Sequence, residues 1–248
     1  MTTLSVMIIT KNEAHDIADC LASVSWADEI IVVDSGSMDD TVAICQRYTD
    51  KISVTDWQGF GIQKNRALDR TTGDWVLSID ADERVSPELH QALQRAINAP
   101  DGAVAFSLPR RSSYCGKVIH YGDWRNDRVI RLFKRGQARF CNSKVHESLQ
   151  VQGPVKALHA PLIHYAFKDR AEVIAKTQQY STLGAEQHYL AGKRANYSTA
   201  FWHGLWTFLR GYIIRAGFLD GSAGLQLALS NATGCYYRYI KLARMSRQ

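Results

Sequence analysis

The chain has 248 residues with a formal net charge of +6, and 46% of its residues are hydrophobic while 22% are charged. These values are typical of a soluble globular protein with one large domain, or one domain and an appendage. The five cysteines are scattered without C-x-x-C spacing, which argues against a zinc cluster and a disulfide framework. We expect a reducing compartment and no signal peptide.

The positive charge is concentrated at the C-terminal end of the sequence. Residues 187–248 contain eight Lys and Arg and a single acid, Asp220, whereas the other 186 residues contain 22 basic and 23 acidic groups. All of the excess positive charge therefore lies in the last quarter of the chain.

Strand-like and helix-like segments alternate through the first 80 residues. The predicted strands span residues 4–10, 29–33, 51–54 and 75–79, and the predicted helices span residues 14–25, 41–48 and 62–70. This alternation predicts a parallel sheet covered by helices, in which ligands bind at the carboxyl ends of the strands. Polar residues follow three of these ends, at 10–13, 34–37 and 80–83.

Asp80 and Asp82 follow the last of these strands, separated by one small residue. Two carboxylates this close repel each other unless a cation lies between them, and oxygen ligands favour Mg²⁺ or Mn²⁺. The alternative is a chance triplet that caps the next helix, although Ser86 and Pro87 already supply a helix start. No G-x-G-x-x-G follows the first strand and no P-loop occurs, so a metal is expected to hold the phosphates.

The second half of the sequence has a different pattern. Residues 104–151 predict short antiparallel strands with basic and aromatic side chains, as expected for a second substrate site. The region 187–248 is rich in aromatic residues, and one helical stripe contains Phe201, Leu205, Phe208, Leu209 and Tyr212. With its basic residues, such a helix either lies on anionic lipid or packs against the catalytic domain or a dimer partner.

Four segments of the first 85 residues resemble the family 2 glycosyltransferases, which have the GT-A fold. They are residues 10–13, residues 31–37 with Asp39 and Thr41, residues 61–65 and residues 79–83. Later segments resemble the lipopolysaccharide core glucosyltransferase subgroup of the WaaE or KdtX type; they are residues 131–133, 145–147, 164–165 and 218–221.

The resemblance implies an α/β GT-A fold with a mostly parallel sheet, helices on both faces and a C-terminal helical extension. The catalytic domain would span residues 1–186, with the nucleotide-sugar part at 1–100 and the acceptor part at 101–186, and residues 187–248 would form the basic tail. We also expect a cytoplasmic protein, peripheral on the inner membrane, with no nucleic acid partner. A nucleotide sugar and a lipopolysaccharide core or related glycolipid would be its substrates.

The same resemblance assigns roles to individual residues. Thr10, Glu13 and Asp34 would bind the base and ribose, and Lys64 would contact the donor. Asp80 and Asp82 would take the ribose and the Mg²⁺ or Mn²⁺ ion that bridges the diphosphate, with Asp82 the preferred direct ligand. Weaker analogy adds His164 as a contact of the metal or the diphosphate.

The implied reaction is inverting transfer of a sugar, glucose from UDP-glucose, to a heptose of the inner core. The acceptor hydroxyl must lose its proton to a carboxylate, and the resembling segment at 145–147 makes Glu147 the candidate base. Asp123 and Asp127 are the alternatives. The alternative is a transferase for another cell-envelope glycan.

Two other classes compete with a glycosyltransferase. A Mg²⁺-dependent phosphotransferase of the haloacid dehalogenase type also uses Asp-x-Asp, but it would want Thr or Val where Arg84 stands and would place the motif after the first strand. A membrane-surface binding module would need the basic tail and not Asp82. No recognition motif accompanies the positive charge, which argues against nucleic acid.

Overall fold

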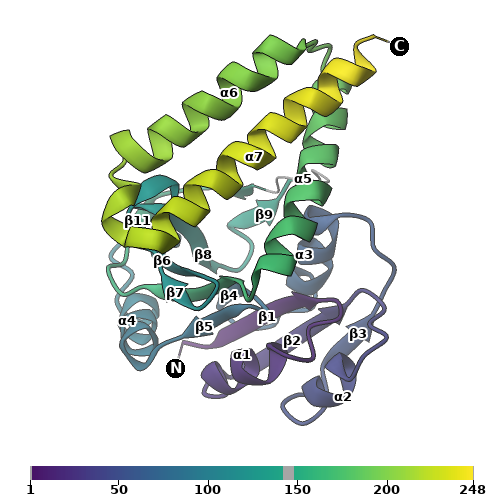
Figure 1. The fold of residues 1–248 in the computed structure, drawn as a ribbon. Helices are drawn as coiled ribbons and strands as arrows, with labels where there is room; N and C mark the ends of the chain where they lie inside the picture. The colour runs from purple at the N-terminus through teal and green to yellow at the C-terminus, as the bar shows by residue number, and fades with distance from the viewer. Residues whose placement is uncertain (1, 142–147, 248) are drawn as a thin grey trace. The chain divides into compact units, whose positions relative to one another are not determined.

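The computed structural model describes residues 2–141 and 148–247 (Figure 1). The chain forms two compact units: unit 1 comprises Met1–Arg110 and Asp127–His164, and unit 2 comprises Arg111–Asn126 and Tyr165–Gln248. The predicted boundary between residues 186 and 187 lies inside helix α5 (Arg170–Leu190) and stays a prediction.

Unit 1 begins with four parallel strands in the order β3-β2-β1-β4. They are β1 (Leu4–Thr10), β2 (Glu29–Asp34), β3 (Ile52–Val54) and β4 (Trp75–Asp80). Helices α1 (Ile17–Ser23), α2 (Thr41–Cys45) and α3 (Phe60–Leu68) connect them. The segments predicted as strands and helices are therefore present, and their ends differ by a few residues from the predicted ones.

Both faces of this parallel sheet are covered. Because side chains alternate along a strand, Val6 and Ile8 of β1 point to one face, where they join the core built with α1 and with α4 (Pro87–Asn98). Met7 points to the other face, where it packs with Ala67 and Leu68 of α3. Burial on both faces explains why β1, β2 and β4 read as continuous apolar runs.

The rest of unit 1 turns the sheet into a mixed one. Strand β8 (Arg128–Lys134) runs antiparallel to both β4 and β6 (Ala105–Tyr114). The remaining strands are β5 (Glu83–Val85), β9 (Ala138–Phe140), β10 (Leu149–Val151), β11 (Val155–Ala157) and β12 (Leu162–Phe167). The main path reads β3-β2-β1-β4-β8-β6-β12-β5, so the predicted α/β class and the antiparallel section are confirmed.

Unit 2 is mainly helical. Its long helices are α5, α6 (Tyr197–Leu209) and α7 (Gly221–Met245), and α7 packs against both α5 and α6. Its short elements are β7 (Lys117–Val118) and the helical turns η1 (Gly122–Trp124), η2 (Arg210–Ile214) and η3 (Gly217–Asp220). The predicted C-terminal helical extension is therefore present.

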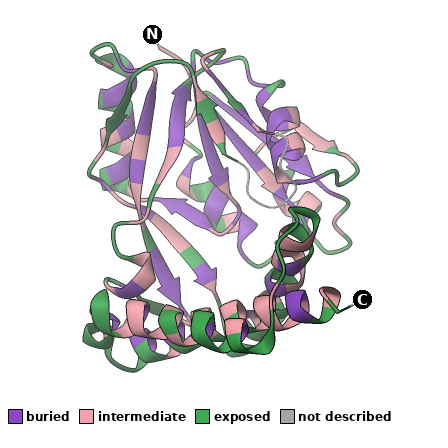
Figure 2. Cartoon of the chain, turned by 90° about the horizontal axis from the view of Figure 1, so that it is seen from above, coloured by how far each residue is buried: buried purple, intermediate pink, exposed green. Residues whose placement is uncertain are grey.

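Burial differs between the strands and the C-terminal helices (Figure 2). The strands β1, β2 and β4 are almost entirely buried, whereas α6 and α7 alternate between buried and exposed positions. Among the described residues, no helix combines the length and the apolar character needed to cross a bilayer.

Candidate active site

Three parallel strands end side by side in unit 1. Strand β1 lies between β2 and β4, and its last residue, Thr10, is in register with Asp34, while Ile9 is in register with Asp80. The carboxyl ends therefore bring Thr10, Asp34 and Asp80 to one edge of the sheet. The convergence of polar strand ends that the sequence predicts is confirmed.

The loops that follow β1 and β2 are tied to each other. The Asn12 backbone N–H donates to the Ser37 hydroxyl (2.8 Å), and the Met38 N–H donates to the Asn12 side-chain oxygen (2.9 Å). The Glu13 N–H donates to the Thr41 hydroxyl (2.8 Å). These bonds fix the segment that carries Glu13 against the loop after β2, so this edge of the sheet is ordered before any ligand arrives.

Asp34 and Thr10 differ in how their oxygens are used. Asp34 is fully buried, and its Oδ1 accepts from the backbone N–H groups of Gly36 (2.9 Å) and Ser37 (2.8 Å), while the Ser37 hydroxyl donates to Oδ2. The Thr10 hydroxyl is also buried, but it has no hydrogen-bond partner in the part of the chain that the structure describes. A buried hydroxyl without a partner is costly, so Thr10 offers an unused polar group at the strand edge.

Asp80 is held between two cations. Lys64 Nζ lies 3.0 Å from Asp80 Oδ1, and Arg131 Nη2 donates to Asp80 Oδ2 and to Glu83 Oε1 (2.6 Å from the latter). Glu83 also accepts from the Asp80 backbone N–H through Oε2 (3.0 Å). Lys64, Arg131 and Glu83 are buried, which is tolerable only because each charge faces an opposite one.

The two carboxyls of this cluster titrate in opposite directions. Burial alone would raise the pKa of Asp80, but Arg131 and Lys64 outweigh burial and hold that pKa well below its usual range. Burial raises the pKa of Glu83, and Arg131 opposes this only in part. Asp80 is therefore a permanent anion, and Glu83 takes up a proton more readily than an ordinary glutamate.

Asp82 and His164 form a second group beside this cluster. Strand β12 is antiparallel to β5 and places His164 opposite Glu83, so that His164 Nε2 lies 3.5 Å from Asp82 Oδ2. A carboxylate oxygen and an imidazole nitrogen suit a divalent ion. The described residues contain no group of three or more metal-binding side chains.

The three candidates for the base have different surroundings. Glu147 lies outside the described residues. Asp127, in unit 1, is bound by Arg110 at 2.6 Å. Asp123, in unit 2, is 3.1 Å from Arg210 and 2.8 Å from Arg215, which makes it a partner of two arginines.

Sequence reasoning did not predict a role for Arg131 or Glu83, and it predicted only a loose donor contact for Lys64. The signal for Arg131 is its position in an apolar strand, between Ile130 and Leu132. A charge placed there must have a buried partner. Its pairing with Asp80, 51 positions away, depends on the antiparallel register of β4 and β8 and was not visible in the pattern.

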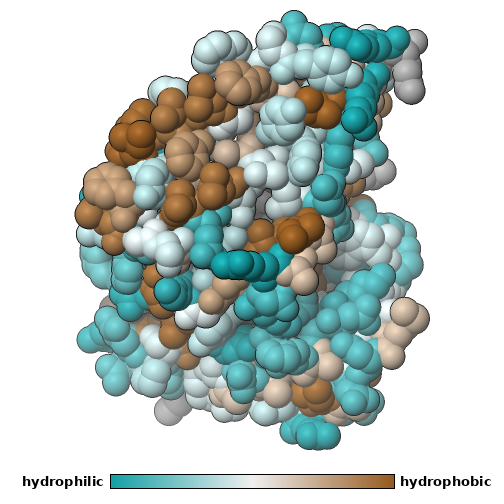
Figure 3. All heavy atoms as spheres, viewed as in Figure 1, coloured by the Kyte–Doolittle hydropathy of each residue, from teal (hydrophilic) through white to brown (hydrophobic). Residues whose placement is uncertain are grey.

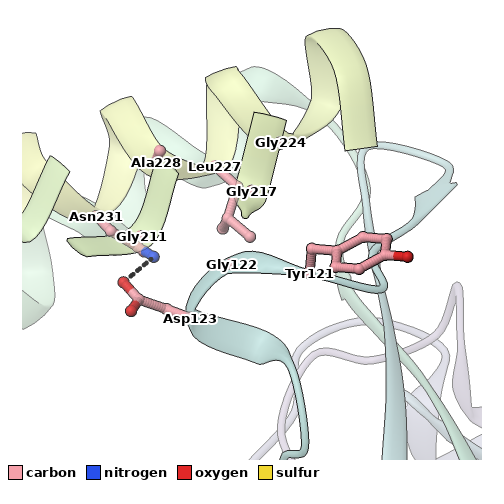
Figure 4. Close-up of a pocket in the computed structure, with 9 residues that line it drawn as sticks. All are labelled: Tyr121, Gly122, Asp123, Gly211, Gly217, Gly224, Leu227, Ala228 and Asn231. Atoms are coloured by element: carbon pink, nitrogen blue, oxygen red, sulfur yellow. Dashed lines mark hydrogen bonds between the residues drawn. The ribbon is translucent and has the colours of Figure 1, made fainter. Parts of the chain in front are cut away.

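Unit 2 contains a narrow cavity where η1, η2, η3 and α7 meet, and this cavity has no room for a water molecule (Figure 4). Its lining includes Asp123, which accepts from the Asn231 side chain at 3.3 Å, and several glycines. A Cβ atom on Gly224 would lie 1.8 Å from the Gly217 carbonyl oxygen, so the backbones touch directly. This close packing makes the cavity a structural feature of unit 2.

Comparisons with known proteins place the chain in a family of glycosyltransferases. The glycosyl transferase family 2 profile matches residues 5–149. The lipopolysaccharide core biosynthesis glycosyltransferase LpsC of Rhizobium meliloti is 32% identical over 255 residues, which cover 97% of this chain and 94% of that protein. An uncharacterized glycosyltransferase of Rickettsia felis is 30% identical over 263 residues, covering 99% of this chain and 90% of the relative.

Solved structures match a smaller part of the chain. Glucosyl-3-phosphoglycerate synthase from Mycobacterium tuberculosis, in complex with Mg²⁺ and uridine diphosphate, is similar at a TM-score of 0.38 and 29% identity. The match covers 46% of this chain and 44% of that one, so less than half of the solved structure is spanned.

Proposed function

The chain belongs to glycosyltransferase family 2, and we propose that it transfers glucose from UDP-glucose to a heptose of the lipopolysaccharide inner core, with inversion at the anomeric carbon. The observation that carries this proposal is the meeting of Thr10, Asp34 and Asp80 at one sheet edge, next to Asp82 and His164. Similarity to LpsC over nearly the whole chain supports an acceptor in the lipopolysaccharide core. The choice of glucose and heptose rests on the subgroup resemblance of the later segments.

The nucleotide would bind across the ends of β1 and β2. The unpaired Thr10 hydroxyl supplies a hydrogen-bonding group, and Glu13 lies on a loop that four neighbouring contacts already hold in place. Asp34 completes the set from β2, where it also keeps its own loop closed. Such preorganisation lowers the entropy lost when the donor binds.

Asp82 and His164 would hold the Mg²⁺ or Mn²⁺ ion. When bound, the ion offsets the negative charge that develops on the departing diphosphate. Asp80 is less suited to be a direct ligand, because Lys64 and Arg131 already occupy both of its oxygens. As a metal ligand, Asp80 would have to release one of those cations, so we assign it to the ribose side of the site.

Lys64 and Arg131 would set the electrostatics of the donor site. With Asp80 ionised and the pKa of Glu83 raised, the buried group carries no large excess of negative charge that would repel a diphosphate. The acceptor hydroxyl must give up a proton, and we assign this step to the Glu147 carboxylate. Asp123 and Asp127 are already engaged in ion pairs with arginines, so we keep these two carboxylates as the alternatives.

The proposal is tested by a transfer assay with purified protein. UDP-glucose, UDP-galactose and ADP-heptose are each supplied with Mn²⁺ and an inner-core oligosaccharide that ends in heptose, and the product linkage is determined by NMR. We expect a β-linked glucose from UDP-glucose, and no product when a chelator removes the metal. Hydrolysis of simple phosphate esters without transfer from any nucleotide sugar would contradict the proposal and favour a phosphotransferase.

A further inference from the structure

Helix α6 of unit 2 exposes three large aromatic side chains, while two of its small residues are buried. Phe201 is 55% exposed, Trp202 is 64% exposed and Trp206 is 54% exposed, whereas Ala200 and Gly204 are buried. A helix that packs on a protein core shows the reverse distribution. The apolar character of α6 therefore is not explained by its packing inside unit 2.

The contacts of Gly204 explain this orientation. A Cβ atom on Gly204 would lie 3.2 Å from the Tyr236 Cβ and 3.4 Å from the Ala232 carbonyl oxygen, so this face of α6 packs closely on α7. At 100° per residue, Trp202 and Trp206 each lie about 160° from Gly204 around the helix axis. The two tryptophans therefore point away from α7.

The apolar face continues beyond the end of α6. The rings of Phe208 and Tyr212 stack with centroids 5.3 Å apart, and Tyr212 meets Phe218 edge to face at 6.3 Å. Ile213 and Leu219 extend the face and are 55% and 56% exposed. Figure 3 shows hydrophobic side chains gathered along α6 and the turn that follows it. We call this surface the α6 face; it comprises Phe201, Trp202, Trp206, Ile213, Phe218 and Leu219.

Positive charge surrounds the beginning of α6. Lys193 and Arg194 precede the helix and are exposed, and the Arg247 guanidinium lies over the Tyr197 ring at 4.4 Å. Unit 2 as a whole contains fourteen Lys and Arg against five Asp and Glu. Of the acids on either side of α6 in the sequence, Glu186 on α5 is exposed, whereas Asp220 accepts from the backbone N–H groups of His120 and Tyr121.

From this combination we infer that the α6 face docks on the surface of an anionic lipid bilayer, with the helix lying along the interface. Tryptophan and tyrosine prefer the membrane interface, and lysine and arginine are attracted by anionic headgroups. A second copy of the chain fits less well as the occupant, because two copies meeting through this face would bring two strongly positive units together. The α6 face belongs to unit 2 and the strand-edge site to unit 1, so docking does not depend on which sugar is transferred.

The test is a vesicle sedimentation assay with the purified full-length chain, without sugars or metal. The vesicles consist of phosphatidylcholine alone, or of phosphatidylcholine with about one third phosphatidylglycerol. Three proteins are compared: the parent chain, the double variant Trp202→Glu with Trp206→Glu, and Ile174→Glu. Ile174 lies on α5 and is as exposed as Trp202, at 64%, so this variant controls for adding a carboxylate to an exposed apolar position.

We expect the parent and Ile174→Glu to sediment with the anionic vesicles. The partition coefficient of the Trp202→Glu, Trp206→Glu variant should be lower by a factor of about ten or more. A second variant, Lys193→Glu with Arg194→Glu, leaves α6 intact and should lose the preference for phosphatidylglycerol. Equal sedimentation of the parent and both double variants would overturn the inference. So would a parent that stays in the supernatant, or a parent dimer that the tryptophan variant converts to a monomer.

Discussion

The strand edge of unit 1 and the α6 face of unit 2 depart from the usual distribution of side chains in opposite ways. At the strand edge, Asp80, Lys64 and Arg131 are charged groups in or beside the core, and each has an oppositely charged partner. On α6, Trp202 and Trp206 are large apolar groups that face solvent. Folding alone favours neither arrangement, because burying charge and exposing aromatic surface both cost free energy. We propose that the first arrangement serves a chemical site in unit 1 and the second a surface for a partner in unit 2.

The largest expected effect is a loss of transferase activity on substitution in the strand edge of unit 1. Asp82→Asn keeps the shape of the side chain but removes the charge that would hold the metal, so we expect glucose transfer to fall by about 100-fold or more. The matched control is Asp101→Asn, an exposed aspartate paired with Lys156 in the same unit, which should transfer at the parent rate. Steady-state assays with saturating donor measure both. Parent-like transfer by Asp82→Asn would remove Asp82 from the proposed site.

The next prediction concerns the stability of the buried cluster. Arg131→Met leaves Asp80 and Glu83 without their shared cation, and we expect the free energy of unfolding to fall by about 3 to 5 kcal/mol. The control is Arg139→Met, because Arg139 pairs with Asp69 on the surface and its loss should cost about 1 kcal/mol or less. Urea denaturation measures the two values. Equal losses would mean that burial does not strengthen the Asp80 cluster.

A third prediction uses pH to probe the charged interior of unit 1. Burial would raise the pKa of Glu29, but hydrogen bonds from Lys51, Ser5 and Thr72 lower it to about 2 from 4.5. The pKa of Glu29 in the folded protein is lower than in the unfolded chain, so the stabilisation that ionised Glu29 supplies is complete above the unfolded-state pKa. It is lost as the pH falls from about 5 to 2. The corresponding loss in the free energy of unfolding is about 3 kcal/mol. Glu29→Gln should flatten the pH dependence of the urea midpoint in this window, and an unchanged slope would contradict the assignment.

The smallest expected effect is on the α6 face. Because Trp202 points away from α7, Trp202→Glu should change the free energy of unfolding by no more than about 0.5 kcal/mol. Gly204→Leu, two positions along the same helix, should destabilise the protein clearly, because its side chain would meet Tyr236 and Ala232. Thermal unfolding of both variants compares the two sides of one helix. A severe loss in Trp202→Glu would show that the tryptophan packs within the protein.

The sequence pattern was sufficient to predict the parallel strands at the beginning of unit 1. The apolar runs at 4–10, 29–33 and 75–79 correspond to β1, β2 and β4, because strands buried on both faces produce unbroken apolar segments. The polar ends of these strands then had to meet at one edge, since parallel strands share the direction of their carboxyl ends. Thr10, Asp34 and Asp80 could therefore be predicted to lie together.

Other features depend on contacts between distant segments and could not be predicted. His164 lies near Asp82, 82 positions away, through the pairing of β12 with β5. Only the family resemblance pointed to His164, because a lone histidine in a sequence pattern gives no sign of such a partner. The apolar stripe predicted for α6 shares only Phe201 with the α6 face, because the exposed Trp202 and Trp206 lie outside that stripe. Periodicity does not say which side of a helix packs on its neighbour. The close contact of Gly204 with α7 decided that question.

The central claim is that Asp82, with His164, completes a divalent-ion and nucleotide-diphosphate site at the strand edge of unit 1. Isothermal titration of UDP, with and without Mn²⁺, tests this claim without any acceptor. We predict that Mn²⁺ strengthens UDP binding to the parent and to Asp101→Asn, and that Asp82→Asn loses this strengthening. The same gain from Mn²⁺ in Asp82→Asn and in His164→Ala as in the parent would contradict the account.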